Sequence, residues 1–96
     1  MSTHGMRDKM TAIARREARE SFIARFNIMS TSGRLYGPDE LIGSVSRHLS
    51  KCAVGHPRRV ARAWVSSDAF MRMCSGMTPS GVASEVLSRH LRGDLP

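Results

Sequence analysis

The sequence predicts an all-α fold: a compact bundle of four to five short helices that includes a long N-terminal helix. Apolar residues recur at spacings of three and four in separate segments, which is the helical period. Proline or hydroxyl residues precede these segments and glycine follows them, as at helix ends. No Asn-Gly or Asp-Gly turn predicts a β-hairpin. At 96 residues, we expect one helical domain over 1–96, with flexible ends at 1–5 and 93–96.

The first helix is predicted to run from about Met6 to about Met29, which makes it the longest. Its apolar stripe has a four-residue spacing and consists of Met10, Ala14, Ala18, Phe22 and Phe26. The opposite face carries mixed charge and is expected to face solvent. Turn and cap residues from Ser30 to Gly33 end the helix.

The second helix is predicted to begin at Pro38, because proline favours the first helical position and two acidic residues follow it. It is expected to end before the Gly-His-Pro segment 55–57. Its predicted buried stripe is Leu41, Val45, Leu49 and Cys52.

The segment 57–75 is predicted to form either one kinked helix or two short helices, because Ser66, Ser67 and Asp68 resemble a new N-cap. Trp64 lies on the same helical face as Val60 and is expected in the core. A last helix begins at Thr78 and Pro79 and ends at Gly93. Its predicted stripe is Val82, Ala83, Val86, Leu87, His90 and Leu91.

Basic residues dominate the charge of the chain and limit the classes of partner. The formal net charge is +7, and thirteen of the fifteen cationic residues are arginine. The 27 residues between Glu40 and Asp68 contain no acid and carry Arg47, Lys51, Arg58, Arg59 and Arg62. His48 and His56 can add charge in mildly acidic solution. An anionic partner is therefore expected, either nucleic acid or an acidic protein surface.

No catalytic or cofactor motif accompanies these cations. The chain has no nucleophile elbow, phosphate-binding loop or dinucleotide fingerprint, so we predict a protein that is not an enzyme and needs no cofactor. His48, Cys52 and His56, with Cys74 or His90, are candidate zinc ligands. A glycine and a proline interrupt the helix there and no CxxC motif pre-forms a site, so we do not expect a metal.

The two cysteines and the short apolar runs favour a cytoplasmic protein. At most one disulfide is possible, and no secretory signal or membrane-spanning segment is recognisable, so membrane insertion is not expected. The sequence Ser-Arg-His-Leu occurs twice, at 46–49 and 88–91. It predicts either a duplicated unit with two Arg-His pairs or two ordinary helix ends.

Two function classes stay open. The first is a small regulatory protein that binds nucleic acid through the cations around the turn between the second and third helices. Helix-turn-helix templates fit poorly there, so phosphate contact without sequence reading is expected. The alternative is a protein-binding regulator, such as an inhibitor, antirepressor or adaptor from a phage or mobile element. It would act through the first-helix residues Phe22, Ile23 and Phe26, through homodimerisation, or through both.

Overall fold

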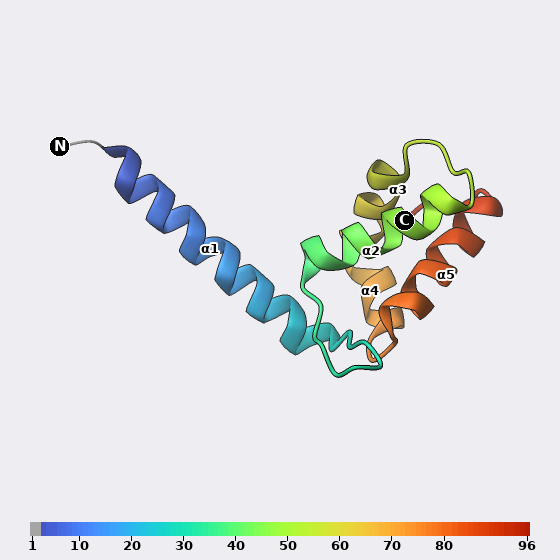
Figure 1. Ribbon diagram of the computed structural model, residues 1–96, viewed down its shortest axis with the longest axis horizontal. Coiled ribbons are helices and arrows are strands. Elements are labelled where there is room, and N and C mark those ends of the chain that lie inside the picture. The colour runs from blue at the N-terminus through green and yellow to red at the C-terminus, as the bar shows by residue number, and fades with distance from the viewer. Residues whose placement is uncertain (1–2) are drawn as a thin grey trace.

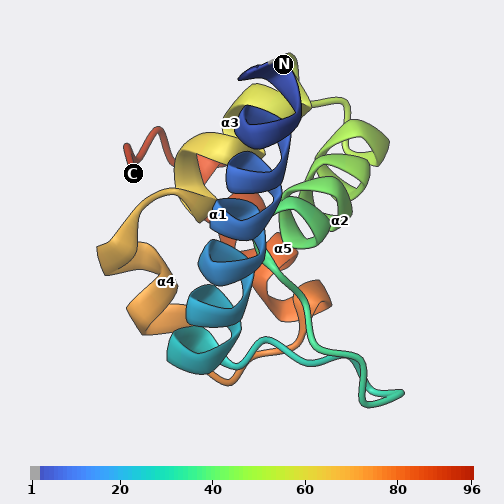
Figure 2. The same ribbon diagram turned by 90° about the vertical axis from the view of Figure 1, so that its left-hand side faces the viewer.

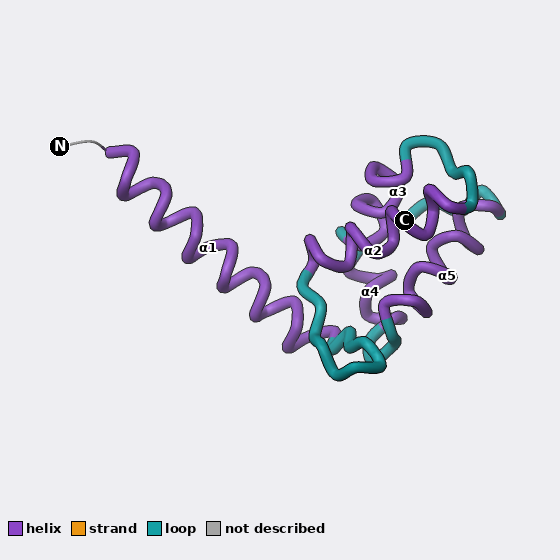
Figure 3. Tube along the Cα trace, viewed as in Figure 1, coloured by secondary structure: helices purple, strands orange, loops and turns teal. Residues whose placement is uncertain are grey.

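A computed structural model describes the backbone of residues 3–96 and the side chains of residues 10–96. Its helices are α1 (Thr3–Phe26), α2 (Pro38–Lys51), α3 (Pro57–Val65), α4 (Asp68–Cys74) and α5 (Pro79–Leu91) (Figure 1). The predicted all-α class is confirmed: no named strand occurs in the described chain, and Met29 and Leu35 form one isolated antiparallel bridge (Figure 3). α1 begins at Thr3, inside the segment predicted to be a flexible end, and residues 1–2 lie outside the described part.

Helices α2 to α5 pack together, with α2 in contact with both α3 and α5. The N-terminal part of α1 extends away from them, while its last turns reach α4 (Figures 1 and 2). The molecule therefore measures 53 × 28 × 24 Å, and α1 accounts for the long dimension. No described helix has the length and apolar character needed to cross a membrane.

The core lies between all five helices. Most residues of the apolar stripes predicted for α2 and α5 are buried or half-buried. Leu41, Val45 and Leu49 of α2 are fully buried. The other buried apolar residues are Phe22, Phe26, Ile28, Ile42, Ala61, Trp64, Val65, Phe70, Met71, Cys74, Val82, Ala83 and Val86. In the stripes predicted for α2 and α5, two positions are wrong, because Cys52 and Leu91 are exposed. Cys52 is the residue where the chain leaves α2, and Leu91 is the last residue of α5.

The stripe of α1 is buried only at its C-terminal end. Met10, Ala14 and Ala18 are exposed, whereas Phe22 and Phe26 enter the core and pack edge to face at 4.9 Å. Hydrogen bonds also hold this end of α1 against the segment after α4. The Phe26 carbonyl accepts one from the Gly76 N–H and one from the Ser75 hydroxyl. A periodic stripe predicts a helix, but whether another element covers the stripe depends on the tertiary arrangement.

α1 ends three residues earlier than predicted. Asn27 adopts a left-handed backbone with φ of 50°, a conformation that asparagine tolerates better than most residues. The chain then turns Ile28 into the core, and the Ile28 carbonyl accepts a hydrogen bond from the Tyr36 N–H at 2.9 Å. The segment 28–36 is thus a short looped turn between α1 and α2.

The segment 57–75 forms two helices, which decides between the two predicted arrangements. Ser67 caps α4, because its hydroxyl oxygen accepts a hydrogen bond from the Phe70 N–H at 3.3 Å. Trp64 is 3% exposed and packs its ring against Phe70 at 5.0 Å, so its predicted place in the core is confirmed.

The turn between α2 and α3 contains two residues in the left-handed region, Ala53 at φ of 60° and His56 at φ of 51°. At Ala53, the arrangement is a Schellman motif: the Val54 N–H donates to the Leu49 carbonyl and the Ala53 N–H donates to that of Ser50. Glycine is the usual residue at the position of Ala53, because a Cβ atom is strained there.

Replacing Ala53 with glycine is therefore expected to stabilise the protein by about 0.5–1 kcal/mol. Ala63→Gly is the matched control, since Ala63 is exposed within α3. There, the same substitution is expected to destabilise by roughly 1 kcal/mol. Urea unfolding followed by circular dichroism would measure both changes. A decrease in stability at Ala53 equal to that at Ala63 would contradict this description of the turn.

Candidate nucleic-acid interface

The five cations of the acid-free interval are all exposed. Arg47 and Lys51 lie in the second half of α2, and Arg58, Arg59 and Arg62 lie on α3. We call these five residues the basic corner. Arg58 and Arg62 are four residues apart and so lie on adjacent turns of one face. Among the side chains of residues 10–96, no ion pair within 4.0 Å includes any of the five.

Most other arginines of the bundle are neutralised by carboxylates. Asp68 pairs with two of them, at 3.1 Å to Arg25 and at 2.6 Å to Arg72. The described ion pairs also include Arg19 and Arg34 with Glu40, Arg89 with Glu85, and Arg92 with Asp94. The acidic side chains are thus drawn to arginines outside the basic corner, and the corner keeps its positive charge.

The structure divides the basic corner between two surfaces. Arg47 and Lys51 line a cavity of about 370 Å³ between α2 and α5, together with His48. We call it the α2–α5 pocket. Arg58 instead lines a cavity beside α1 and the start of α2. Arg59 and Arg62 line none of the described cavities. The structure therefore does not bring the five cations together in one cavity, and it separates Arg47 and Lys51 from Arg58.

Three cations that the sequence did not single out join Arg58 on the α1 side. They are Arg15, Arg16 and Arg19, on the face of α1 expected to be merely solvated. Asp39 and Glu40 line the same cavity, so its charge is mixed. No periodic signal in the sequence could show that this part of α1 and Arg58 line the same cavity.

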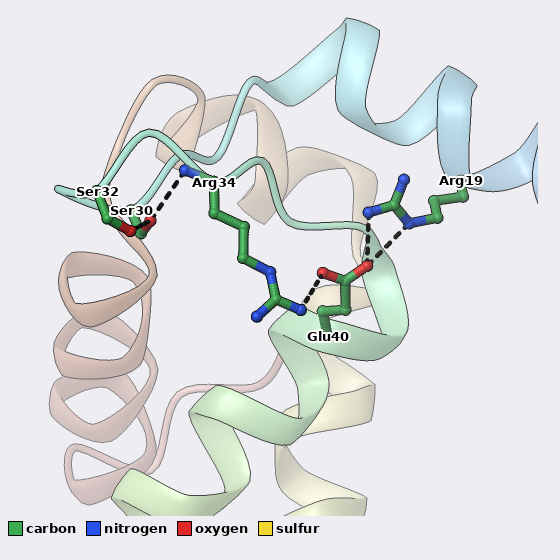
Figure 4. Close-up of polar contacts among 5 residues, drawn as sticks. All are labelled: Arg19, Ser30, Ser32, Arg34 and Glu40. Atoms are coloured by element: carbon green, nitrogen blue, oxygen red, sulfur yellow. Dashed lines mark hydrogen bonds and ion pairs between the residues drawn. The ribbon is translucent and has the colours of Figure 1, made fainter.

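Glu40 joins α1, the turn and α2 through two arginines (Figure 4). Its Oε1 accepts a hydrogen bond from Arg19 Nε at 2.8 Å and forms an ion pair with Arg19 Nη2 at 2.7 Å. Its Oε2 accepts a hydrogen bond from Arg34 at 3.2 Å. Burial alone would raise the pKa of the Glu40 carboxyl, but the hydrogen bonds and charges of the two arginines hold that pKa below its ordinary value. Arg19 lies across Gly37, where a Cβ atom would be 2.7 Å from its Cγ.

The two Ser-Arg-His-Leu segments do not form equivalent sites. Arg47 is exposed and unpaired among the described side chains, whereas Arg89 donates to Glu85 at 2.9 Å and stacks over the ring of Trp64. Leu49 is fully buried and Leu91 is 72% exposed. The structure therefore supports the interpretation of two ordinary helix ends.

The cysteines occupy opposite environments and are both free. Cys52 is exposed, and Cys74 is fully buried. Burial raises the pKa of the Cys74 thiol to about 11; the charge of Glu85 adds to this rise and that of Arg89 opposes it. Within residues 10–96, no three His, Cys, Asp or Glu side chains are grouped closely enough to hold a metal ion.

Cys52 is expected to react with Ellman's reagent in the native protein, while Cys74 is expected to react only after unfolding. The thiolate is the reactive species, and Cys74 is both shielded and hard to deprotonate. Counting the thiols that react before and after addition of guanidinium would measure this, with Cys52→Ser as the control. Rapid native labelling of Cys52→Ser would show that Cys74 is not buried in solution.

The three residues predicted as the partner face of α1 are mostly covered within this chain. Phe22 and Phe26 belong to the core, and Ile23 is half-buried. The exposed apolar side chains of α1 lie nearer its beginning, at Met10, which is 66% exposed, and at Ile13, which is 48% exposed. The large exposed apolar side chains described on α1 thus lie outside the predicted face.

Comparison of the chain with protein-family models, with curated proteins and with solved structures finds no match.

Proposed function

We propose that this protein is a small, non-enzymatic regulatory protein that binds nucleic acid through the basic corner. One observation carries the proposal: the five exposed cations of the corner have no carboxylate partner among the described side chains, while six other arginines are paired. Exposed, unpaired arginines offer planar forks of donors that match phosphate oxygens. A polyanion would neutralise this charge and release its counterions.

The contact is with phosphates, without reading of base sequence. α3 is nine residues long and begins at a proline, and its buried face is committed to the core through Ala61, Trp64 and Val65. Its cationic face is left to contact the backbone of the partner. Contacts to phosphate position a protein on nucleic acid but carry no sequence information directly.

Binding of fluorescent oligonucleotides of two unrelated sequences, followed by anisotropy at several salt concentrations, tests this function. The expected result is similar affinity for both sequences, with the logarithm of the affinity falling linearly with that of the salt concentration. Single- and double-stranded DNA and RNA would each be tried. No binding to any of them at low salt would overturn the proposal.

The second candidate function is protein binding, with a second copy of this chain as the partner. Every residue of α1 from Met10 to Ser21 is exposed. Because an isolated helix in water is only marginally stable, packing against a second copy would stabilise this part of α1. On this segment Arg16 and Glu20 are four residues apart and lie on one face of the helix. An antiparallel copy centred at position 18 would place Arg16 of one copy across from Glu20 of the other.

Sedimentation equilibrium with nuclease-treated protein tests this second candidate. A dimer in the parent protein that becomes a monomer in Met10→Lys/Ile13→Lys would support it, and a monomer at all concentrations would exclude self-association. The nucleic-acid test is independent, since neither residue belongs to the basic corner.

A further inference from the structure

The α2–α5 pocket differs from the other described cavities in the charge of its walls. The other three described cavities each include at least one carboxylate, from Asp39, Glu40 or Asp68. The α2–α5 pocket has no acidic residue on its walls. An anion entering this pocket would therefore meet cationic side chains without an opposing carboxylate.

Three nitrogen-bearing side chains of α2 line one wall of the pocket: Arg47, His48 and Lys51. They are spaced so that Arg47 and Lys51 lie one turn apart on the same face of the helix. A guanidinium fork and an ammonium group at this spacing can donate to different oxygens of one phosphate. Neither cation is held by an ion pair with the described side chains.

Hydroxyl groups line most of the remaining walls, beside Pro79 and Ala83. The hydroxyl groups come from Ser30, Thr31, Tyr36, Ser44, Thr78 and Ser80. The oxygen of Thr78 already accepts a hydrogen bond from the Gly81 N–H at 3.1 Å, so its own hydrogen is free to donate outward. A wall rich in hydroxyl groups suits a ligand with many oxygens, such as the sugar next to a phosphate.

The size of the pocket distinguishes a lone phosphate from a larger ligand. Its volume of about 370 Å³ lies in the range of pockets that hold small organic molecules, roughly 300–1,000 Å³. A phosphate alone would leave most of this volume unfilled. A phosphate with its attached sugar and base uses both the cationic wall and the hydroxyl walls.

We propose that the α2–α5 pocket binds one nucleotide unit, with its phosphate against Arg47, His48 and Lys51 and its sugar along the hydroxyl groups. The proposal rests on the nucleic-acid function proposed above. It assigns different contacts to different residues of the basic corner. The pocket holds one nucleotide, and Arg59 and Arg62 contact the backbone phosphates of the same strand outside it.

Titration of the ¹⁵N-labelled protein with adenosine 5′-monophosphate, adenosine and inorganic phosphate tests this proposal by nuclear magnetic resonance. The expected result is that adenosine monophosphate shifts the amide signals of Lys51, Thr78 and Ser80 at lower concentration than phosphate does, and that adenosine alone shifts them least. Arg47→Ala/Lys51→Ala should weaken nucleotide binding by roughly tenfold or more, because it removes charge-assisted hydrogen bonds. Arg72→Ala/Arg92→Ala removes the same charge from ion-paired arginines outside the basic corner and should leave nucleotide binding unchanged.

Binding of the three compounds also separates this proposal from the function on which it rests. If neither adenosine monophosphate nor phosphate shifts these signals at millimolar concentration, the pocket is not a nucleotide site, even where oligonucleotides still bind. Equal weakening of nucleotide binding by the two double variants would also overturn the proposed nucleotide site, since it would indicate a general effect of net charge. If the nucleotide binds as expected but no oligonucleotide does, the pocket stands as a site for free nucleotides and the nucleic-acid function fails.

Discussion

Replacing Trp64 with alanine is expected to lower the free energy of unfolding by about 3–5 kcal/mol, the usual cost of removing a buried large aromatic side chain. Trp64 is 3% exposed on α3 and packs edge to face against Phe70 of α4 at 5.0 Å. The guanidinium of Arg89 from α5 lies over the rings of both aromatic residues, at 5.9 and 5.5 Å from their centroids. The indole thus joins three helices, and its removal would leave a cavity at their meeting point.

Two control variants make the Trp64 prediction specific to burial. Trp64→Phe keeps a ring for Phe70 to contact and is expected to cost about 1.5 kcal/mol. Leu91→Ala also removes a large apolar side chain, at the end of α5, but Leu91 is 72% exposed, so a change within about 0.5 kcal/mol is expected. Denaturant unfolding followed by circular dichroism measures all three. A stability of Trp64→Ala within that margin of the parent would contradict the packing described here.

Reversing the charge of Arg58, Arg59 and Arg62 together is expected to abolish retention of the protein on nucleic acid. Each Arg→Glu change lowers the charge by two, so the formal net charge falls from +7 to +1. The new carboxylates would repel phosphates at the positions where the arginines attract them. Affinity at low salt should fall by roughly two orders of magnitude or more. The helical signal should persist, because all three side chains are exposed.

A matched triple variant separates the basic corner from net charge. Arg25→Glu/Arg72→Glu/Arg92→Glu has the same net charge of +1. It alters arginines that are paired with Asp68 and Asp94. The pairs are partly exposed, so losing each pair is expected to cost no more than about 1 kcal/mol, and the new repulsion from Asp68 or Asp94 adds a similar amount. This variant should bind nucleic acid clearly better than the charge-reversed corner, and equally weak binding by both would mean that the corner has no special role.

Local signals in the sequence predicted the helices well. Pro38, Pro57 and Pro79 each begin a helix, and Ser67 caps α4. These signals act within one turn of the chain, so they can be recognised without the tertiary structure. The end of α1 was less predictable, because it depends on Ile28 entering the core beyond the left-handed Asn27.

Features that join distant segments could not be predicted in the same way. Arg19 reaches Glu40 across 21 positions, and Arg25 reaches Asp68 across 43. Such pairs decide which arginines are neutralised, and the sequence alone does not distinguish one arginine from another. The exposure of Met10 and Ile13 could not be predicted either, because these residues follow the same helical period as the buried Phe22 and Phe26. Only the fold shows where α1 leaves the bundle.

The dependence of affinity on salt concentration in two neutralised variants tests most directly whether the unpaired cations form the nucleic-acid interface. Arg58→Gln/Arg59→Gln/Arg62→Gln and Arg25→Gln/Arg72→Gln/Arg92→Gln remove the same charge, from the basic corner and from ion-paired positions respectively. Removing one arginine that binds a phosphate should reduce the slope of log affinity against log salt by about one. We predict a slope shallower by roughly two to three for the corner variant and unchanged for the paired variant. Equal slopes in the corner variant and the parent protein would contradict the proposed interface.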